Sequence, residues 1–308
     1  MHPLTSKKRS INGILLLDKP KGMTSNQALQ TIKQLFSASK AGHTGSLDPL
    51  ATGLLPICFG EATKFSQFLL NANKIYCVTA RLGIKTNTGD AEGEVIESRP
   101  VSKYSLDQLE TILSAFRGSI SQIPPMFSAL KHKGRPLYKL ARQGIVVERN
   151  PRTVTIHSLR LLEGNDENIL KLEIKCSKGT YIRTLIEDIG EALGCGAYVH
   201  NLRRLGVANY LAEQMVSLET LQSLSSAECE QKLLSLDSLL NEWPIVEISQ
   251  AAAYYLYRGQ AVLLPNLPKQ GFMRLLLQES RRFIGVGEIL EDGRIAPRRL
   301  VDLSKLGI

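Results

Sequence analysis

Asp48 is the only acid in the glycine-rich stretch GHTGSLDPLATG. A single carboxylate in an otherwise neutral loop indicates chemistry, because it is ionised near neutral pH and can act as a nucleophile. Gly42, Gly45 and Gly53 permit a positive φ and a close approach of the backbone, and Pro49 stiffens the chain directly after the acid. The alternative role is a turn residue or a helix cap, which is the ordinary use of an Asp before Pro.

A second feature is the basic stretch from 126 to 160, which has eight Lys or Arg against one acid, Glu148. The whole chain of 308 residues carries 38 Lys and Arg against 29 Asp and Glu, a formal net charge of +9. This excess favours a polyanionic partner, above all a nucleic acid, because bound cations release the counterions of phosphates. For any individual lysine the alternative is a solvated charged surface.

Several classes of protein are disfavoured by the composition. The five cysteines are scattered and form no CxxC pair, so we expect neither a disulfide framework nor a zinc site, and we expect a reducing, cytoplasmic setting. The apolar run Ile14 to Leu17 is far below the roughly 20 residues that cross a bilayer, so no membrane association is expected. GHTG lacks the lysine of a phosphate-binding loop, which argues against a nucleotide triphosphatase.

Elements around Asp48 follow from hydrophobic periodicity and from capping residues. We expect buried strands at Ile14–Leu17 and Leu54–Phe59, a helix from Thr24 or Ser25 to about Phe36, and a short helix at Ala62–Leu70. These elements would frame the acid.

Later segments predict further strands and helices by the same patterns. Alternation predicts a half-buried strand at Lys74–Leu82, and the spacing of apolar residues after KGT predicts a helix that begins near Tyr181 and Arg183. We also expect a strand at Glu94–Ile96, a helix at Ser105–Phe116, and a hairpin of Val154–Leu162 with Ile169–Cys176 around the turn GNDEN.

The stretch from Leu211 to Trp243 has six acids against the single Lys232. Its leucine spacing predicts a helix over Ser225–Leu240, and its charge predicts that it faces away from any RNA. Pro244 would end this helix. The last 60 or so residues alternate short β-like runs with turns, which predicts a small separate β domain.

Four segments together resemble the bacterial TruB tRNA pseudouridine synthases. They are DKPKGMTS at 18–25, the loop at 42–53, KIYCVTARLG at 74–83 and KGTYIRTLIEDIG at 178–190. The similarity runs from about Ile11 to the LRR triplet at 202–204, and the tail FIGVGEILEDGRIAPRRLV resembles the family's C-terminal PUA-like domain.

The resemblance implies isomerisation of the T-loop uridine 55 of tRNA to pseudouridine, with no cofactor and no metal. By the resemblance, Asp48 is the nucleophile, through either a covalent C1′ adduct or a glycal-like intermediate. Tyr76 stacks on the target base and is a possible general base, although a strand tyrosine is otherwise a core residue. Arg183 pairs with Asp48, although periodicity alone favours a surface or phosphate-contacting arginine.

Other positions acquire binding roles from the same resemblance. His43 stacks into the space that the extruded base leaves, Tyr181 supports the active-site wall, Leu202 packs beneath the base, and Lys19 buttresses the floor. An insertion at about 123–152 would grip the T arm through basic residues, namely Lys131, Lys133, Arg135, Lys139 and Arg142.

The resemblance also implies the fold. We expect an α+β pseudouridine synthase core, with a mixed, largely antiparallel sheet and flanking helices, and a PUA-like β domain. The predicted boundaries are a flexible N-terminus at 1–10, a catalytic domain at 11–243 and an RNA-binding domain at 244–308. We expect a monomer that acts on tRNA without an obligate protein partner. The alternatives are a tRNA-folding chaperone and a guide-RNA-dependent pseudouridine synthase.

Overall fold

The computed structural model describes residues 8–163, 168–265 and 267–305. Most of the predicted flexible N-terminus at 1–10 and most of the turn GNDEN lie outside the described residues. Arg9, within that terminus, forms an isolated β-bridge with the body of the protein. No helix in the described part of the chain is both long enough and apolar enough to span a membrane.

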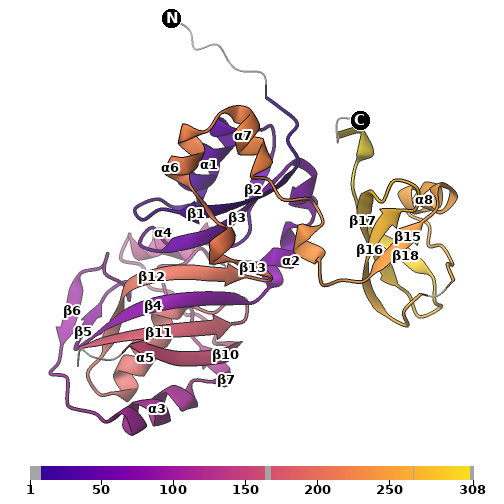
Figure 1. Cartoon of the computed structure of the whole chain (residues 1–308). Coiled ribbons are helices and arrows are strands. Elements are labelled where there is room, and N and C mark those ends of the chain that lie inside the picture. Colours follow the sequence, from indigo (N-terminus) through magenta and orange to yellow (C-terminus); the bar gives the residue numbers. More distant parts are fainter. Residues whose placement is uncertain (1–7, 164–167, 266, 306–308) are drawn as a thin grey trace, which may run out of the picture.

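A ten-stranded mixed sheet forms the body of the protein (Figure 1), in the order β14-β1-β3-β12-β4-β11-β10-β7, with β2 added beside β3 and β13 beside β12. Its strands are β1 (Gly13–Lys19), β2 (Ala41–His43), β3 (Thr52–Phe59), β4 (Lys74–Leu82), β7 (Gly118–Gln122), β10 (Arg152–Glu163), β11 (Ile169–Cys176), β12 (Ala197–Val207), β13 (Tyr210–Leu211) and β14 (Val216–Ser217). Among the described strands of this sheet, only the β1–β14 and β12–β3 pairs are parallel. The predicted mixed, largely antiparallel sheet is confirmed.

Helices flank this sheet, and the first of them begins after Thr24, one of its two predicted caps. They are α1 (Ser25–Leu35), α2 (Ser66–Asn71), α3 (Leu106–Ala115), α5 (Ile182–Ala192), α6 (Leu218–Ser223) and α7 (Ser226–Gln231), with short 3₁₀ segments η1 (Gly60–Lys64), η2 (Ala212–Gln214) and η3 (Ser238–Leu240). Thr24 and Ser105 cap α1 and α3 through capping boxes. The helix α5 buries Ile182, Leu185 and Ile189 against the sheet, as their spacing predicted.

Two predicted helices differ from the structure. The helix expected at Ala62–Leu70 is divided into η1 and α2, with the fully buried Phe65 at the division. The helix expected over Ser225–Leu240 ends at Gln231, because Leu234 exchanges two backbone hydrogen bonds, of 2.8 and 3.0 Å, with Ile14 of β1. Tertiary contacts with β1 and with the C-terminal sheet therefore override the local leucine pattern.

A second sheet of four strands lies to one side of the body (Figure 1, yellow). It contains β15 (Ile245–Ile248), β16 (Gly271–Leu277), β17 (Phe283–Ile289) and β18 (Ile295–Leu300), with α8 (Gln250–Tyr257) against it and η4 (Leu303–Lys305) after it. An aromatic seam joins it to the body: Phe65 packs 5.3 Å from Phe283, and Trp243 stacks 5.2 Å from Phe272, between ring centroids. The small C-terminal β domain is confirmed, while the exact domain boundaries stay predictions.

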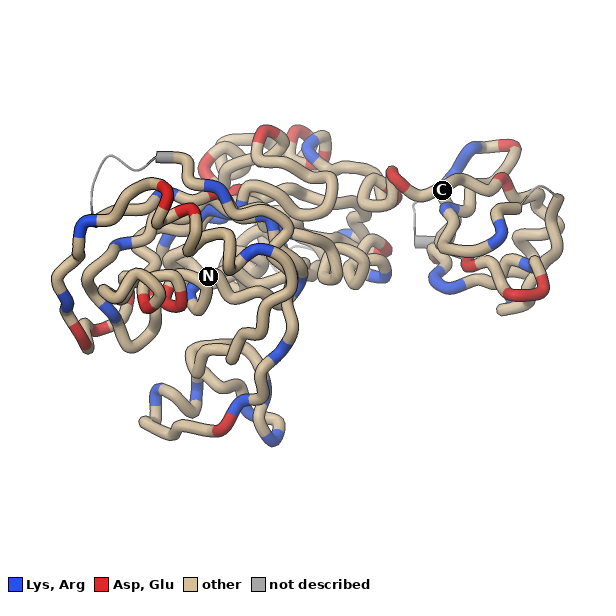
Figure 2. The backbone as a smooth tube through the Cα atoms, turned by 90° about the horizontal axis from the view of Figure 1, so that it is seen from below, with Lys and Arg blue, Asp and Glu red and all other residues tan. Residues whose placement is uncertain are grey.

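The remaining strands belong to two small ribbons. The first pairs β5 (Ile84–Thr86) with β6 (Val95–Ser98), close to the strand expected at Glu94–Ile96. The second lies in the predicted insertion and contains β8 (Lys131–His132), β9 (Arg135–Pro136) and the short helix α4 (Leu137–Ala141). The insertion projects from the body as a lobe that is rich in Lys and Arg (Figure 2). It is accessible to a partner over most of its length.

Gly53 is required where β3 and β12 run side by side. Its φ is +98°, and an added Cβ would lie 2.3 Å from the carbonyl oxygen of Arg204. Gly42 differs from the expectation, because it has no positive φ and an added Cβ would meet no atom within 4 Å. The two glycines of one loop therefore have different roles.

We predict that Gly53→Ala lowers the free energy of unfolding by more than about 2 kcal/mol, because it combines left-handed strain with a backbone clash. Gly42→Ala is the matched control and should change it by less than about 0.5 kcal/mol. Urea unfolding of the two variants measures the difference. Equal effects would contradict the assigned role of Gly53.

Candidate active site

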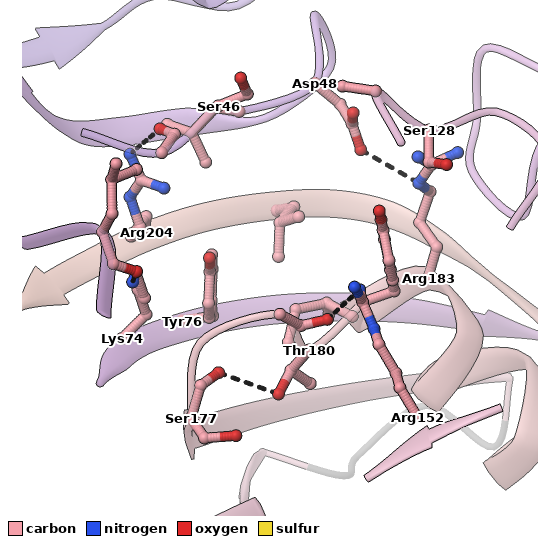
Figure 3. Close-up of a pocket in the computed structure, with 18 residues that line it drawn as sticks. Ser46, Asp48, Lys74, Tyr76, Ser128, Arg152, Ser177, Thr180, Arg183 and Arg204 are labelled. Atoms are coloured by element: carbon pink, nitrogen blue, oxygen red, sulfur yellow. Dashed lines mark hydrogen bonds and ion pairs between the residues drawn. The ribbon is translucent and has the colours of Figure 1, made fainter. Parts of the chain in front are cut away.

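A cavity of about 280 Å³ opens between the Asp48 loop, β4, β12 and the start of α5 (Figure 3). Loop 45–48 contributes one wall, and Tyr76 and Leu202 contribute the sheet face. Ser128 and Ala129, at the base of the insertion, close another side. Segments that are far apart in the sequence therefore meet at one concave site.

The first residue of α1 anchors the Asp48 loop. The buried Ser25 Oγ accepts from the Leu47 amide at 2.7 Å and donates to the Leu47 carbonyl at 3.1 Å. The Gly22 amide donates to the Pro49 carbonyl at 2.8 Å. These bonds fix the backbone on both sides of Asp48, whose side chain remains 44% exposed.

Arg183 holds the Asp48 carboxylate from the start of α5. Its Nε lies 3.0 Å from Asp48 Oδ2, and the arginine side chain is only 6% exposed. Its Nη1 donates to the Thr88 carbonyl at 2.8 Å, and its Nη2 donates to the Phe127 carbonyl at 2.7 Å. One guanidinium thus ties the acid loop to the turn after β5 and to the base of the insertion.

Asp90 is a second counter-charge of the same arginine. Its buried carboxylate lies 3.5 Å from Arg183 Nη1 and accepts from Thr88 Oγ1 at 2.7 Å and from the Glu92 amide at 3.1 Å. Asp90 lies in the polar run TNTGDAEG at 86–93, whose sequence alone does not reveal this role. The role depends on the packing of this turn against α5, which brings Asp90 to Arg183.

The protein raises the pKa of Asp48 above its ordinary value. Desolvation by the surrounding loop is the main cause, the charge of Arg183 opposes it, and the nearby Asp90 adds to it. The carboxylate is therefore more basic than a free aspartate, while Arg183 fixes its orientation.

Tyr76 faces the cavity from β4, where the alternation of buried and exposed residues matches the predicted strand. The residue is 9% exposed. Desolvation raises the pKa of its phenol, and the charge of Arg204 offsets only part of that rise. The hydroxyl therefore keeps its proton at neutral pH.

Leu202 and Tyr181 form two further walls. Leu202 is 8% exposed and lines the cavity from β12. Tyr181 precedes α5, and its backbone amide donates to Gln122 Oε1 at 3.0 Å. The guanidinium of Arg152 lies 4.5 Å from the centroid of the Tyr181 ring, in a cation–π contact.

Lys19 and His43 lie near the cavity but do not line it. Lys19 is fully buried, and its Nζ donates to the carbonyls of Pro20 and Met23 at 2.8 and 2.7 Å. Burial lowers its pKa to about 8. Burial and the charge of Arg204 also lower the pKa of the half-buried His43, so its ring is neutral at pH 7.

The predicted RNA-binding residues of the insertion lie apart from the cavity. Lys131, Arg135 and Arg142 are exposed on the projecting lobe. No group of three or more His, Cys, Asp or Glu in the described residues is arranged to hold a metal ion.

Three cations that line the cavity were missed as site residues: the half-buried Arg152, and Lys74 and Arg204. Lys74 and Arg204 are buried and lie beside Tyr76. A signal was present, because Lys74 occupies an inward position of the β4 alternation and Arg204 belongs to the LRR triplet. Charged residues at inward strand positions are rare unless they have a specific role.

Comparison with protein families covers most of the chain. Residues 33–182 match the N-terminal domain of the TruB family pseudouridylate synthases, residues 183–242 match the C-terminal domain of tRNA pseudouridylate synthase B, and residues 244–301 match the C-terminal region of pseudouridine synthase II TruB.

Similar proteins include the tRNA pseudouridine synthase B of Coxiella burnetii (strain Dugway 5J108-111), which is 58% identical over 96% of each chain. The protein of the same name from Tolumonas auensis is 55% identical and spans 97% of this chain and 94% of its own length. That from Pseudomonas fluorescens is 55% identical over 96% of this chain and 97% of its own.

Solved structures with a similar fold include a Cbf5-Nop10-Gar1 complex, with a TM-score of 0.72 and 22% identity over 95% of this chain and 85% of the other. An H/ACA RNP bound to a substrate RNA containing 2′-deoxyuridine gives a TM-score of 0.69 at 21% identity, over 94% and 84% of the two chains. At these identities the likeness concerns the fold.

We predict that Asp90→Ala costs about 3 kcal/mol of folding free energy, because the buried Arg183 loses a buried counter-charge. Asp48→Ala should cost less than about 1 kcal/mol, because the Asp48 side chain is half exposed and Arg183 keeps its other partners. Urea unfolding compares the two variants. A larger loss for Asp48→Ala would contradict this division of roles.

Proposed function

The chain belongs to the TruB family of pseudouridylate synthases, and from this membership we propose that it converts uridine 55 in the T loop of tRNA to pseudouridine at the cavity of Asp48. The isomerisation of a tRNA uridine is the activity named for the relatives at 55–58% identity. One observation supports the assignment of the reaction to this cavity. The Asp48 carboxylate is half exposed there beside Tyr76 and Leu202, and Arg183 holds it at 3.0 Å.

The reaction moves the bond between sugar and base from N1 to C5 of uracil. A lone pair of the Asp48 carboxylate bonds to C1′ while the C1′–N1 electron pair leaves with the uracil. After the uracil rotates, C5 displaces the carboxylate from C1′, C5 loses its proton and N1 gains one. In the alternative course, Asp48 assists loss of the C2′ proton and a glycal replaces the ester.

Arg183 orients the carboxylate in either course, because its Nε donates to Asp48 while its other donors are fixed by two backbone carbonyls. The raised pKa of Asp48 makes the carboxylate a better nucleophile or base than a free aspartate. A carboxylate with a raised pKa is also protonated at a higher pH, so activity should fall on acidification at a pH above the ordinary pKa of aspartate.

The target base must leave the T loop to reach the cavity, which costs a few kcal/mol of stacking. We assign Tyr76 and Leu202 to the two faces of the extruded uracil. The protonated Tyr76 phenol suits stacking better than proton abstraction, since its raised pKa disfavours the tyrosinate. The neutral ring of His43 is suited to fill the space that the base leaves.

The exposed basic lobe is the surface proposed to bind the T arm. Lys131, Arg135 and Arg142 present positive charge to solvent, and Glu148 is the only acid at 123–152. Phosphate contacts of this kind position an RNA without reading its sequence. We further propose that the protein acts as a cytoplasmic monomer without a protein partner.

We predict that Asp48→Asn lowers product formation by roughly 10⁴-fold or more, because the amide is not a nucleophile. Affinity for unmodified tRNA should stay within about threefold, because Asp48 makes no contribution to phosphate binding. The test is pseudouridine mapping on a tRNA transcript after incubation with pure protein, alongside a filter-binding assay. Asp107→Asn, at an exposed site on α3, is the control.

Residual product from Asp48→Asn at more than a few per cent of the normal rate would rule out the nucleophile. If the unaltered protein binds tRNA but forms no pseudouridine, the tRNA-folding chaperone becomes the better account.

We predict that neutralising the lobe weakens tRNA binding and flattens its salt dependence. The variant replaces Lys131, Lys133, Arg135, Lys139 and Arg142 by Gln. The slope of log K against log salt should fall by roughly 0.7–0.9 for each RNA phosphate that the variant no longer neutralises. Lys103→Gln, an exposed lysine before α3, is the control. An unchanged slope would place the RNA elsewhere on the surface.

A further inference from the structure

Two buried cations occupy the part of the cavity away from the Asp48–Arg183 pair. Arg204 is 1% exposed and Lys74 is 7% exposed, and both line the cavity. Figure 3 places them together at one end, with Asp48 and Arg183 at the other. Arg183 offsets the Asp48 carboxylate at one end of the cavity, whereas Lys74 and Arg204 at the other end face no carboxylate of the described residues.

Neither cation has a carboxylate partner within the described part of the chain. Arg204 donates from Nε to the Leu54 carbonyl at 2.6 Å and from Nη2 to the Gly45 carbonyl at 3.1 Å. Lys74 Nζ donates to the carbonyls of Leu69, Leu70 and Ala72 at 3.2, 2.9 and 2.6 Å, so it acts on a ligand through its charge and not through a free donor. Neutral carbonyls offset only part of the several kcal/mol that burial of a charge costs.

The contrast with Arg183 is informative, because that buried guanidinium faces both Asp48 and Asp90. Two buried charges without such partners indicate that the missing negative charge arrives with the substrate or develops during the reaction. Arg204 has five donors, and its two carbonyl bonds leave three for the Tyr76 hydroxyl and for a ligand.

Strand register brings both cations to the Tyr76 ring. Lys74 and Tyr76 are two residues apart on β4 and therefore point to the same face of the sheet. Arg204 is the direct cross-strand partner of Tyr76 on β12. Positive charge thus lies beside the surface on which the uracil is proposed to stack.

Breaking the bond between C1′ and N1 creates negative charge at this location. The electron pair of that bond departs with the uracil, where it is shared between N1, O2 and O4. We propose that Arg204, with Lys74 beside it, stabilises the uracil anion as it leaves C1′, an inference that rests on the proposed function. The nucleophile and the leaving group lie on opposite sides of C1′ in such a displacement, and Asp48 and these cations lie at opposite ends of the cavity.

Donors that are fixed before the reaction stabilise a developing charge without reorganising, and the loss of one commonly costs about 10²–10³-fold in rate. The carbonyls of Leu54 and Gly45 hold the Arg204 guanidinium in this way. The same cations could instead neutralise a phosphate of the extruded nucleotide. Their removal would then lower the affinity for RNA and leave the rate of base departure unchanged.

The test uses T-arm RNA with uridine or 5-fluorouridine at the target position, under single-turnover conditions. Fluorine makes the uracil a better leaving group, so its departure depends less on an external cation. For Arg204→Gln we expect a loss of about 100-fold with uridine and of less than about tenfold with 5-fluorouridine, measured as disappearance of the N-glycoside. Arg204→Lys retains the charge and should lose less than Arg204→Gln with uridine.

The matched control is Arg203→Gln. Arg203 is the adjacent residue of β12, and its Nη2 donates to Asp18 Oδ2 at 2.7 Å. It should show no dependence on fluorine. Equal losses of Arg204→Gln on both substrates, or a loss confined to RNA affinity, would overturn the proposal. Should Arg204→Gln not fold, Lys74→Met takes its place, and a loss of rate that is equal with uridine and with 5-fluorouridine would overturn the proposal. A normal protein inactive on both RNAs would instead refute the proposed function.

Discussion

The bonds of the Arg183 guanidinium are the interaction on which the site depends. Asp48, Thr88 and Phe127 come from three separate segments, and each one contacts this group. Because the arginine side chain is only 6% exposed, its charge has little water around it and requires these partners. The need to satisfy one buried cation therefore aligns the acid loop, the turn after β5 and the base of the lobe.

The other buried cations make the interior of the site positive. Lys19, Lys74 and Arg204 are all nearly or fully buried, and their charges act on one another: burial is the main cause that lowers the pKa of Lys74 to about 8, and Arg204 adds to it. Such an arrangement is costly for a protein that only needs to be stable. It is consistent with strain that is retained at functional sites because the chemistry uses it.

The C-terminal sheet is linked to the same site through α2. Phe65 and Phe68, at the start of this helix, pack against the aromatic seam, and the carbonyls at its end hold Lys74. The two domains are thus joined by packing close to the cavity and by a partly buried polar contact, in which Glu61 accepts from the Asp302 amide at 2.7 Å. The placement of Lys74 depends in part on this seam.

The sequence by itself determined the elements with strong local signals. Capping boxes set α1 and α3, alternation set β4, and the loop of Asp48 was recognisable because its glycines and its single acid are adjacent in the chain. Helix ends that depend on distant contacts were wrong, as at Leu234, which pairs with Ile14. Only the tertiary structure decided that Asp90 supports Arg183 and that Lys74 and Arg204 flank Tyr76. These relations arise from strand register and from the satisfaction of buried charge, and neither leaves a periodic signal in the sequence.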